Sequence, residues 1–251
     1  MAGSLGGMVP HPLPGPLPRR ATLLGLGSLG FAGCATGPFG ALGGTPLAAL
    51  PPDGLVLLRQ GIPGAMMSGL GFALAPGLVA TSAHLVRDFG AAGPGQRLRG
   101  ALGDGRPVPL TTLAVSRSMD LALLASAVPL AAVPLAAHRP RPGERIWLAG
   151  APAMNRAVVE GAVTRARLPT RAGEGFVVAA EATLGFSGGP AVNGRGEVVG
   201  MTAALVNAGP LPVLSTMLLG TDLGALLGDE SRQVLVLHAD GLAREAARLA
   251  A

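Results

Sequence analysis

The sequence of 251 residues contains no lysine and no tyrosine, and it has a single cysteine. Charged residues make up only 13% and aromatic residues 3%, against 49% hydrophobic residues. A chain so poor in charge is not a solvated, disordered polymer. A single cysteine excludes an intrachain disulfide. The 40 glycines and 23 prolines interrupt the long periodic runs that a helical bundle or coiled coil requires.

The sequence lacks basic runs and has few side chains that could stack on bases, which limits the kinds of partner that we expect. All 19 basic residues are arginine, and the net charge is +5. They are scattered along the chain without forming a basic cluster, so we expect no nucleic-acid partner. The four histidines lie far apart, and the cysteine lies outside the expected domain. No ligand spacing for a metal is therefore present, and we expect neither metal nor cofactor.

The first 33 residues are typical of an export signal. The pair Arg19-Arg20 precedes an uncharged stretch over 21–33, which is too short to span a bilayer because that takes about 20 residues. The arginine pair resembles a twin-arginine signal. The string Phe31–Cys34 resembles a bacterial lipobox, which predicts lipidation of Cys34 and attachment to the membrane. The alternative is an ordinary cleaved signal in which Cys34 has no role.

The rest of the chain, from residue 34 onward, divides into three segments. Residues 34–52 are rich in glycine and proline and predict a flexible tether. A folded domain is expected over 53–228, and 229–251 form a C-terminal extension. Short apolar or alternating runs, separated by turn residues, predict an all-β sandwich or pair of barrels. The expected strands are Val56–Leu58, Gly71–Leu74, Leu78–Ala80, Val108–Val115, Leu121–Leu124, Arg145–Ala149, Ala157–Val163, Phe176–Ala179, Ala191–Val192, Val198–Ala203 and Leu211–Leu214. Helical spacing appears only over Ser215–Leu227 and Leu242–Leu249.

Three short segments carry chemistry, and the first ends in His84. It follows the predicted strand 78–80, so the strand would hold its backbone in place. A general base needs one imidazole nitrogen free and the other held by a partner. The other histidines, His11, His138 and His238, lie respectively in the signal, in an expected linker and near the C-terminus.

The second segment places Asp120 directly before the apolar run 121–124. A carboxylate at the point where burial begins is costly unless it is paired. An imidazole N–H is such a partner. Two other acids are less suitable, because Asp88 is too close to His84 in sequence and Asp104 lies in a predicted hairpin turn.

The third segment is Gly185–Pro190, with the sequence Gly-Phe-Ser-Gly-Gly-Pro. A serine nucleophile needs a base and an oxyanion hole. Glycines allow the tight backbone that aims two N–H groups at one point, here those of Gly185 and Ser187. The small residues that follow keep the approach to Ser187 open.

Together these segments resemble a trypsin-like serine protease, closest to the bacterial high-temperature-requirement (Deg-type) branch. The order His, Asp, Ser matches that family, and the resemblance covers its protease domain only, over about 54–228. The matching strings are Gly69–Leu74 with Leu78–His84, Asp120–Leu124, and Ser187–Asn193 with Gly196–Gly200.

The resemblance implies an all-β fold of two antiparallel β-barrels (chymotrypsin-like), with the active site between them and a short C-terminal helical segment. Barrel one would cover about 53–137 and barrel two about 138–228. The implied activity is that of an exported serine endopeptidase of the periplasm or cell envelope. It would hydrolyse peptides or unfolded proteins through an acyl-enzyme intermediate.

The family also implies a role for each residue. Ser187 attacks the scissile carbonyl, His84 takes its proton and Asp120 orients His84. The N–H groups of Gly185 and Ser187 hold the oxyanion. A strand would pair with the substrate backbone; it comprises Met201, Thr202 and Ala203.

The chain departs from the family pattern around these residues. The approach to the serine, 181–185, is about two residues shorter than the usual Deg-type loop, Phe186 replaces a small polar residue, and Leu70 stands where serine is common. Glu181 lies near the expected base of the specificity pocket. If it points inward, it favours a basic residue at the cleavage site. The alternative is that Glu181 is exposed or tied to an arginine.

Two other functions compete with the protease. The string around Ser187 also fits the nucleophile elbow of an α/β-hydrolase esterase, with Asp222 and His238 as partners. That elbow must lead into a helix, which Gly188-Gly189-Pro190 does not favour. The second alternative is a peptide-binding envelope protein of the same fold that is non-catalytic or is activated by a partner.

Overall fold

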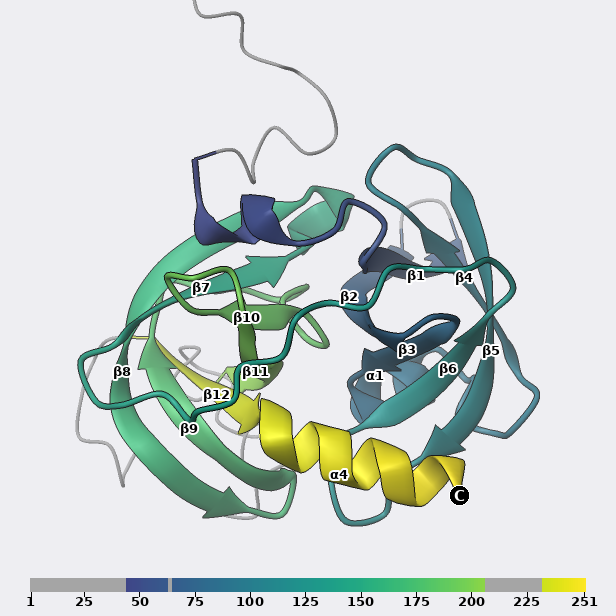
Figure 1. Cartoon of the computed structure of the whole chain (residues 1–251). Helices are drawn as coiled ribbons and strands as arrows, with labels where there is room; N and C mark the ends of the chain where they lie inside the picture. The colour runs from purple at the N-terminus through teal and green to yellow at the C-terminus, as the bar shows by residue number, and fades with distance from the viewer. Residues whose placement is uncertain (1–43, 63–64, 206–231) are drawn as a thin grey trace, which may run out of the picture. The chain divides into compact units, whose positions relative to one another are not determined.

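The computed structural model describes residues 44–62, 65–205 and 232–251. They form two closed antiparallel barrels of six strands each, which stand side by side (Figure 1). Barrel one has the strand order β1-β2-β3-β6-β5-β4. Its strands are β1 (Leu55–Ile62), β2 (Ala65–Ala75), β3 (Leu78–Thr81), β4 (Arg97–Ala101), β5 (Pro107–Val115) and β6 (Ala122–Ser126).

Barrel two has the order β10-β11-β12-β9-β8-β7. Its strands are β7 (Arg145–Gly150), β8 (Ala157–Thr170), β9 (Gly173–Ala179), β10 (Pro190–Val192), β11 (Val198–Leu205) and β12 (Gln233–His238). The described helical segments are η1 (Pro46–Ala49), α1 (Ala83–Asp88), η2 (Pro152–Met154) and α4 (Ala239–Ala250). None of the helices in these ranges is long and apolar enough to cross a membrane.

Alternation along the strands fills both barrels and the space between them. In β6, Leu124 belongs to the core of barrel one, while the neighbouring Leu123 belongs to a cluster shared by both barrels. In β12, Val236 and Leu237 divide in the same way between the core of barrel two and the shared cluster. Strands buried on both faces read as continuous apolar runs, and this shared cluster holds the barrels together.

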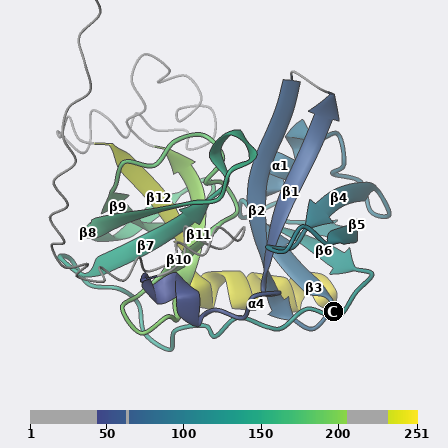
Figure 2. The ribbon, with the colours of Figure 1, turned by 90° about the horizontal axis from the view of Figure 1, so that it is seen from above.

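Helix α4 lies across the two barrels (Figures 1 and 2). It follows directly from β12, and it also contacts β11 and the barrel-one strand β5. Leu242 is fully buried in the shared cluster. On the barrel-one side, Glu245 accepts hydrogen bonds from Ser116 and Ser118, which lie just before Asp120.

The predicted fold class of two chymotrypsin-like barrels is confirmed. Strand β12 lies inside the segment 229–251 that we assigned to a C-terminal extension, and this division is wrong because the barrel closes through it. β12 pairs with both β11 and β9. Strand β4 was also missed, because its alternating sequence Arg-Leu-Arg-Gly-Ala holds few apolar residues. The strand expected at Leu211–Leu214 and the helix at Ser215–Leu227 lie outside the described residues.

The tether prediction for 34–52 also needs correction at its end. Leu47 and Leu50 are buried, and they pack into the shared cluster. Leu47 lies in η1 and Leu50 directly follows it, so this part of the segment is docked on the domain. The export signal and Cys34 lie outside the described residues.

Candidate active site

His84 and Asp120 are brought together by strand pairing in barrel one. β3 pairs with β6 in a register that sets Thr81 opposite Ala122. The chain then turns into α1, whose second residue is His84. Asp120 lies just before β6, and its N–H donates to the Ala172 carbonyl of barrel two at 2.7 Å.

Asp120 accepts two hydrogen bonds from His84. The backbone N–H of His84 donates to Oδ1 at 2.9 Å, and Nδ1 of the imidazole lies 2.8 Å from Oδ2. The Asp120 side chain is 5% exposed and that of His84 is 15% exposed. An ionised carboxylate only accepts hydrogen bonds, so Nδ1 is assigned as the donor, and in the neutral imidazole Nε2 then keeps its lone pair. This is the state that a general base requires.

The loop before Asp120 is tied down by the C-terminal helix. The hydroxyl of Ser116 accepts from the N–H groups of Ser118 and Met119, each at 3.1 Å. Both serines also donate to Glu245 of α4. Hydrogen bonds from Arg248 and the two serines lower the pKa of Glu245 to about 2, with burial opposing them. The carboxylate therefore stays charged and keeps both serine contacts.

Ser187 lies in a turn that joins barrel two to barrel one. The Ser187 carbonyl accepts from the N–H of Leu70 in β2 at 3.0 Å. The next residue, Gly188, donates to Thr202 of β11 at 2.9 Å. Gly188 has φ +75°, and a Cβ there would run into the Leu70 carbonyl and the Thr81 hydroxyl. Only glycine allows this close approach, which sets the serine turn against the strand that leads to His84.

The structure therefore joins His84 to Asp120 directly and brings Ser187 to the same interface. Within the described chain, no hydrogen bond links Ser187 Oγ to His84 Nε2. Such bonds are often long in proteins without substrate and tighten in the complex.

The backbone N–H groups expected to bind an oxyanion are free to do so. Among the described residues, neither Gly185 nor Ser187 donates its N–H to an acceptor. Gly185 has φ +101°, and its carbonyl is turned to accept from Ala151 at 2.9 Å. A side chain at Gly185 would also collide with the backbone of Ala151 and Pro152 at 2.8 Å.

Phe186, which lies between these two N–H groups, anchors the turn, a role that the motif around Ser187 does not predict. Its side chain is buried in the core of barrel two. The ring lies against Gly150, where an added Cβ would be 2.6 Å from two ring carbons. Where the family pattern has a small polar residue, this chain therefore buries an aromatic ring. The sequence feature that goes with this packing is Gly150 at the end of β7, because only a residue without a side chain leaves room for the ring.

The predicted substrate strand is only partly available. Met201 pairs with Pro190 of β10 and with Leu237 of β12. The backbone of Thr202 exchanges hydrogen bonds with the serine turn. Within the described part of the chain, only β12 pairs with β11 from Ala203 onward. An unpaired strand edge therefore begins at Ala203, after Met201 and Thr202.

Glu181 adopts the exposed alternative. Its side chain is 77% exposed and its carboxylate lies 3.6 Å from Nε of Arg232. It does not point into the protein, so the hypothesis of an acidic pocket base at Glu181 has no geometric support.

The esterase arrangement does not fit the structure. The residues after the serine turn form strand β10, not a helix. His238 is buried at the end of β12 with its ring 5.1 Å from that of Phe176, and neither ring nitrogen makes a hydrogen bond. Asp222 lies outside the described residues. In the ranges that the structure covers, no three His, Cys, Asp or Glu side chains gather as metal ligands.

The comparisons agree with this geometry. The sequence profile of the trypsin-like peptidase domain matches residues 69–201, just over half of the chain, and spans His84, Asp120 and Ser187. The chain therefore belongs to the trypsin-like peptidase family.

Solved structures of the Rv3671c protease from M. tuberculosis have a similar fold. An inactive form of a serine-to-alanine mutant is 21% identical, with a TM-score of 0.62, and the match covers 84% of this chain and 93% of that one. The active form is 23% identical, with a TM-score of 0.61, and the match covers 84% of this chain and 87% of that one. No curated protein matches the sequence.

Proposed function

We propose that this protein is a serine endopeptidase that uses Ser187, His84 and Asp120 as its catalytic residues. The observation that carries the proposal is the pair of hydrogen bonds from His84 to Asp120, at 2.9 and 2.8 Å. They fix both the position and the tautomer of the imidazole, and they leave Nε2 for the serine hydroxyl.

The proton moves through His84 in two steps. As Ser187 Oγ attacks the scissile carbonyl carbon, Nε2 takes the hydroxyl proton, and the buried Asp120 carboxylate stabilises the imidazolium. His84 then gives that proton to the leaving amine, and Ser187 becomes acylated. In the second half, water attacks the ester while His84 takes its proton. His84 then returns that proton to Ser187 Oγ as the ester bond breaks, and the acid product leaves.

Two backbone N–H groups would stabilise the charge on the tetrahedral oxygen. Those of Gly185 and Ser187 are free of acceptors in the described chain. Loss of one oxyanion donor typically costs about 10²–10³ in rate, so the conformation of this turn is as important as the triad. The buried ring of Phe186 holds the turn between the two donors.

A substrate would bind by adding a strand to the edge of β11 that opens at Ala203. Main-chain hydrogen bonds of this kind accept many sequences, which suits a peptide or unfolded-protein substrate. The one-sided pairing from Ala203 to Leu205 supports this assignment.

The location and the branch of the family belong to the same proposal. We propose that residues 1–33 direct export to the periplasm or cell envelope, that Cys34 is lipidated, and that the domain is of the Deg type. Metabolic labelling with a fatty-acid analogue, compared between the parent and Cys34→Ala, tests the lipid.

A fluorophosphonate probe tests the central claim. It is applied to the purified full-length protein and to Ser187→Ala, His84→Ala and Asp120→Asn. The parent is expected to become labelled, Ser187→Ala to be silent and His84→Ala to lose nearly all labelling. His138→Ala is the matched control, because His138 lies exposed and apart from Asp120.

The same experiment separates the alternatives. A folded parent that stays unlabelled contradicts the proposal and favours the non-catalytic or partner-activated binding protein. The structural observation in favour of that alternative is that Ser187 and His84 form no hydrogen bond with each other in the described chain. Labelling that survives in Ser187→Ala would assign the reactive group elsewhere.

A further inference from the structure

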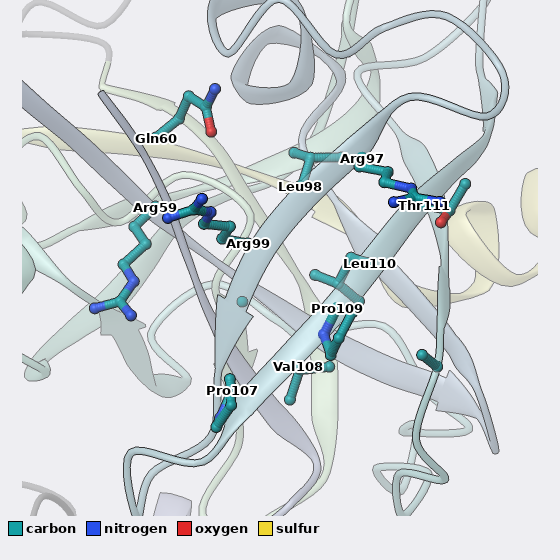
Figure 3. A pocket seen from close by; sticks show the side chains of 12 residues that line it. Arg59, Gln60, Arg97, Leu98, Arg99, Pro107, Val108, Pro109, Leu110 and Thr111 are labelled. Atoms are coloured by element: carbon teal, nitrogen blue, oxygen red, sulfur yellow. The ribbon is translucent and has the colours of Figure 1, made fainter. Parts of the chain in front are cut away.

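Barrel one carries a cavity of about 790 Å³ that is separate from the candidate active site (Figure 3). It lies on β1, β4 and β5, and its lining includes Arg59, Arg97 and Arg99. Neither His84, Asp120 nor Ser187 lines it. The chemistry proposed above therefore gives this cavity no role.

The three arginines share one outer face of the barrel. Arg59 and Arg99 are direct cross-strand partners in the β1–β4 pairing. Arg97 lies two residues before Arg99 and faces the same side, because strand side chains alternate and Leu98 is buried in the core. In Figure 3, Arg59 and Arg99 extend from neighbouring strands, and Arg97 extends toward Thr111.

These charges have no counter-charge in the described structure. No described Asp or Glu lines the cavity, and none of the three guanidinium groups forms an ion pair or hydrogen bond with a described residue. By contrast, Arg145 and Arg167 elsewhere on the surface each pair with a glutamate. Like charges directly opposite one another destabilise an antiparallel pair. An anion held between Arg59 and Arg99 would remove that cost.

The spacing of the arginines indicates what kind of anion fits. Residues i and i+2 of a strand lie about 6.6 Å apart, and so do alternate side chains of any extended peptide. Acidic residues at alternate positions would therefore match Arg97 and Arg99, and guanidinium groups bind carboxylates in a bidentate manner. Pro107 and Pro109 offer apolar contact beside them. None of the described residues that line the cavity is aromatic, so they offer no platform for base stacking of a nucleic acid.

We propose that this cavity binds an extended acidic peptide segment of a partner or substrate protein. The contact does not depend on Ser187, so the site can be tested apart from hydrolysis.

The test is fluorescence anisotropy with a labelled ten-residue peptide of alternating Glu and Val, added to the full-length Ser187→Ala protein. Saturable binding is expected at low salt. It should weaken as salt rises, because exposed charges are screened. The same peptide with Gln in place of Glu is expected not to bind.

Variants locate the binding. Arg99 lies between the other two arginines, so Arg99→Gln alone is expected to weaken binding about tenfold. The triple variant Arg59→Gln/Arg97→Gln/Arg99→Gln should abolish it. The triple control Arg117→Gln/Arg141→Gln/Arg171→Gln removes the same charge from exposed sites outside the cavity and should leave binding unchanged. Thermal unfolding checks that each variant is folded.

Three outcomes overturn the proposal. Equal weakening in both triple variants would make net charge the cause. Equal binding of the Gln peptide would remove the role of the carboxylates. Arginine-dependent binding to phosphatidylserine vesicles without binding of the peptide would assign the cavity to a lipid surface.

Discussion

The carboxylate of Asp120 binds both the side chain and the backbone of His84. One of its oxygens accepts a hydrogen bond from the imidazole, and the other accepts one from the backbone N–H of His84. The pairing of β3 with β6 creates this contact, since it brings Thr81 beside Ala122. The imidazole is therefore fixed by the core of barrel one before any substrate arrives.

Asp120→Asn should abolish most activity while the fold is kept. The Asn amide can donate to Nδ1 and thus favour the wrong tautomer of His84, for which a loss of about 10⁴ in turnover is expected. Peptide hydrolysis and probe labelling measure the effect. Asp88→Asn, at the exposed end of the helix α1 that carries His84, is the control. Full activity in Asp120→Asn would contradict the assigned role.

Phe186→Ala should both destabilise the protein and impair the oxyanion turn. Its buried ring packs on Gly150, so its removal is expected to cost about 3–5 kcal/mol in the free energy of unfolding. Denaturant unfolding and labelling at low temperature measure the two effects. Leu184→Ala is the matched control because Leu184, in the same loop, is 73% exposed. Equal behaviour of the two variants would disprove the anchor.

Glu245→Gln should lower the free energy of unfolding by about 1.5–3 kcal/mol at neutral pH. The variant loses the charged hydrogen bonds by which Ser116 and Ser118, just before Asp120, are held to α4. The folded pKa is about 2, below the ordinary value of 4.5. The stabilisation is therefore present above pH 4.5 and is lost as pH falls toward 2.

Unfolding free energies at pH 7 and pH 3 test this dependence. The gap between the parent and Glu245→Gln should narrow at pH 3. Glu160→Gln removes a partly exposed ion pair with Arg145, and it should change stability by less than about 1 kcal/mol at either pH. A gap that stays constant with pH would rule out the charge of Glu245 as its source.

His238→Leu should stabilise the protein and retain labelling of Ser187. Burial lowers the pKa of His238 and the charge of Arg139 adds to this effect, with the carboxylates of Asp240 and Glu174 opposing it only in part. The unfolded chain therefore takes up a proton more readily, and the parent loses stability as pH falls from about 6.5. Leucine does not ionise, so the variant avoids this loss of stability at low pH. The substitution also removes two buried ring nitrogens that make no hydrogen bond, which should add about 1–3 kcal/mol to the free energy of unfolding.

Thermal unfolding at pH 5 and pH 8 measures that gain, which should be larger at pH 5. His138→Leu changes an exposed histidine and should have little effect. Loss of labelling in a stable His238→Leu protein would instead support the esterase arrangement.

Glu181→Gln should leave the cleavage-site preference unchanged, because the exposed carboxylate faces Arg232. Hydrolysis of matched peptides ending in Arg, Ala or Val at the cleaved position measures this preference. A selective loss of cleavage after Arg would restore Glu181 as a specificity determinant.

Local patterns in the sequence were enough to predict the class of fold and the candidate residues. Alternating runs predicted most strands, and the strings around His84, Asp120 and Ser187 each combine a reactive side chain with a distinctive neighbourhood. Such signals depend on residues within a few positions of one another, where propensity and turn chemistry act directly.

Only the tertiary structure decided contacts between distant segments. Barrel closure made a strand of 233–238, apolar packing docked Leu47, and the buried Phe186 came to lie on Gly150. The pairing of β1 with β4 also set Arg59 opposite Arg99 in barrel one. These contacts depend on which strands pair and in what register. That choice minimises the free energy of the whole core and leaves no mark in a local stretch of sequence.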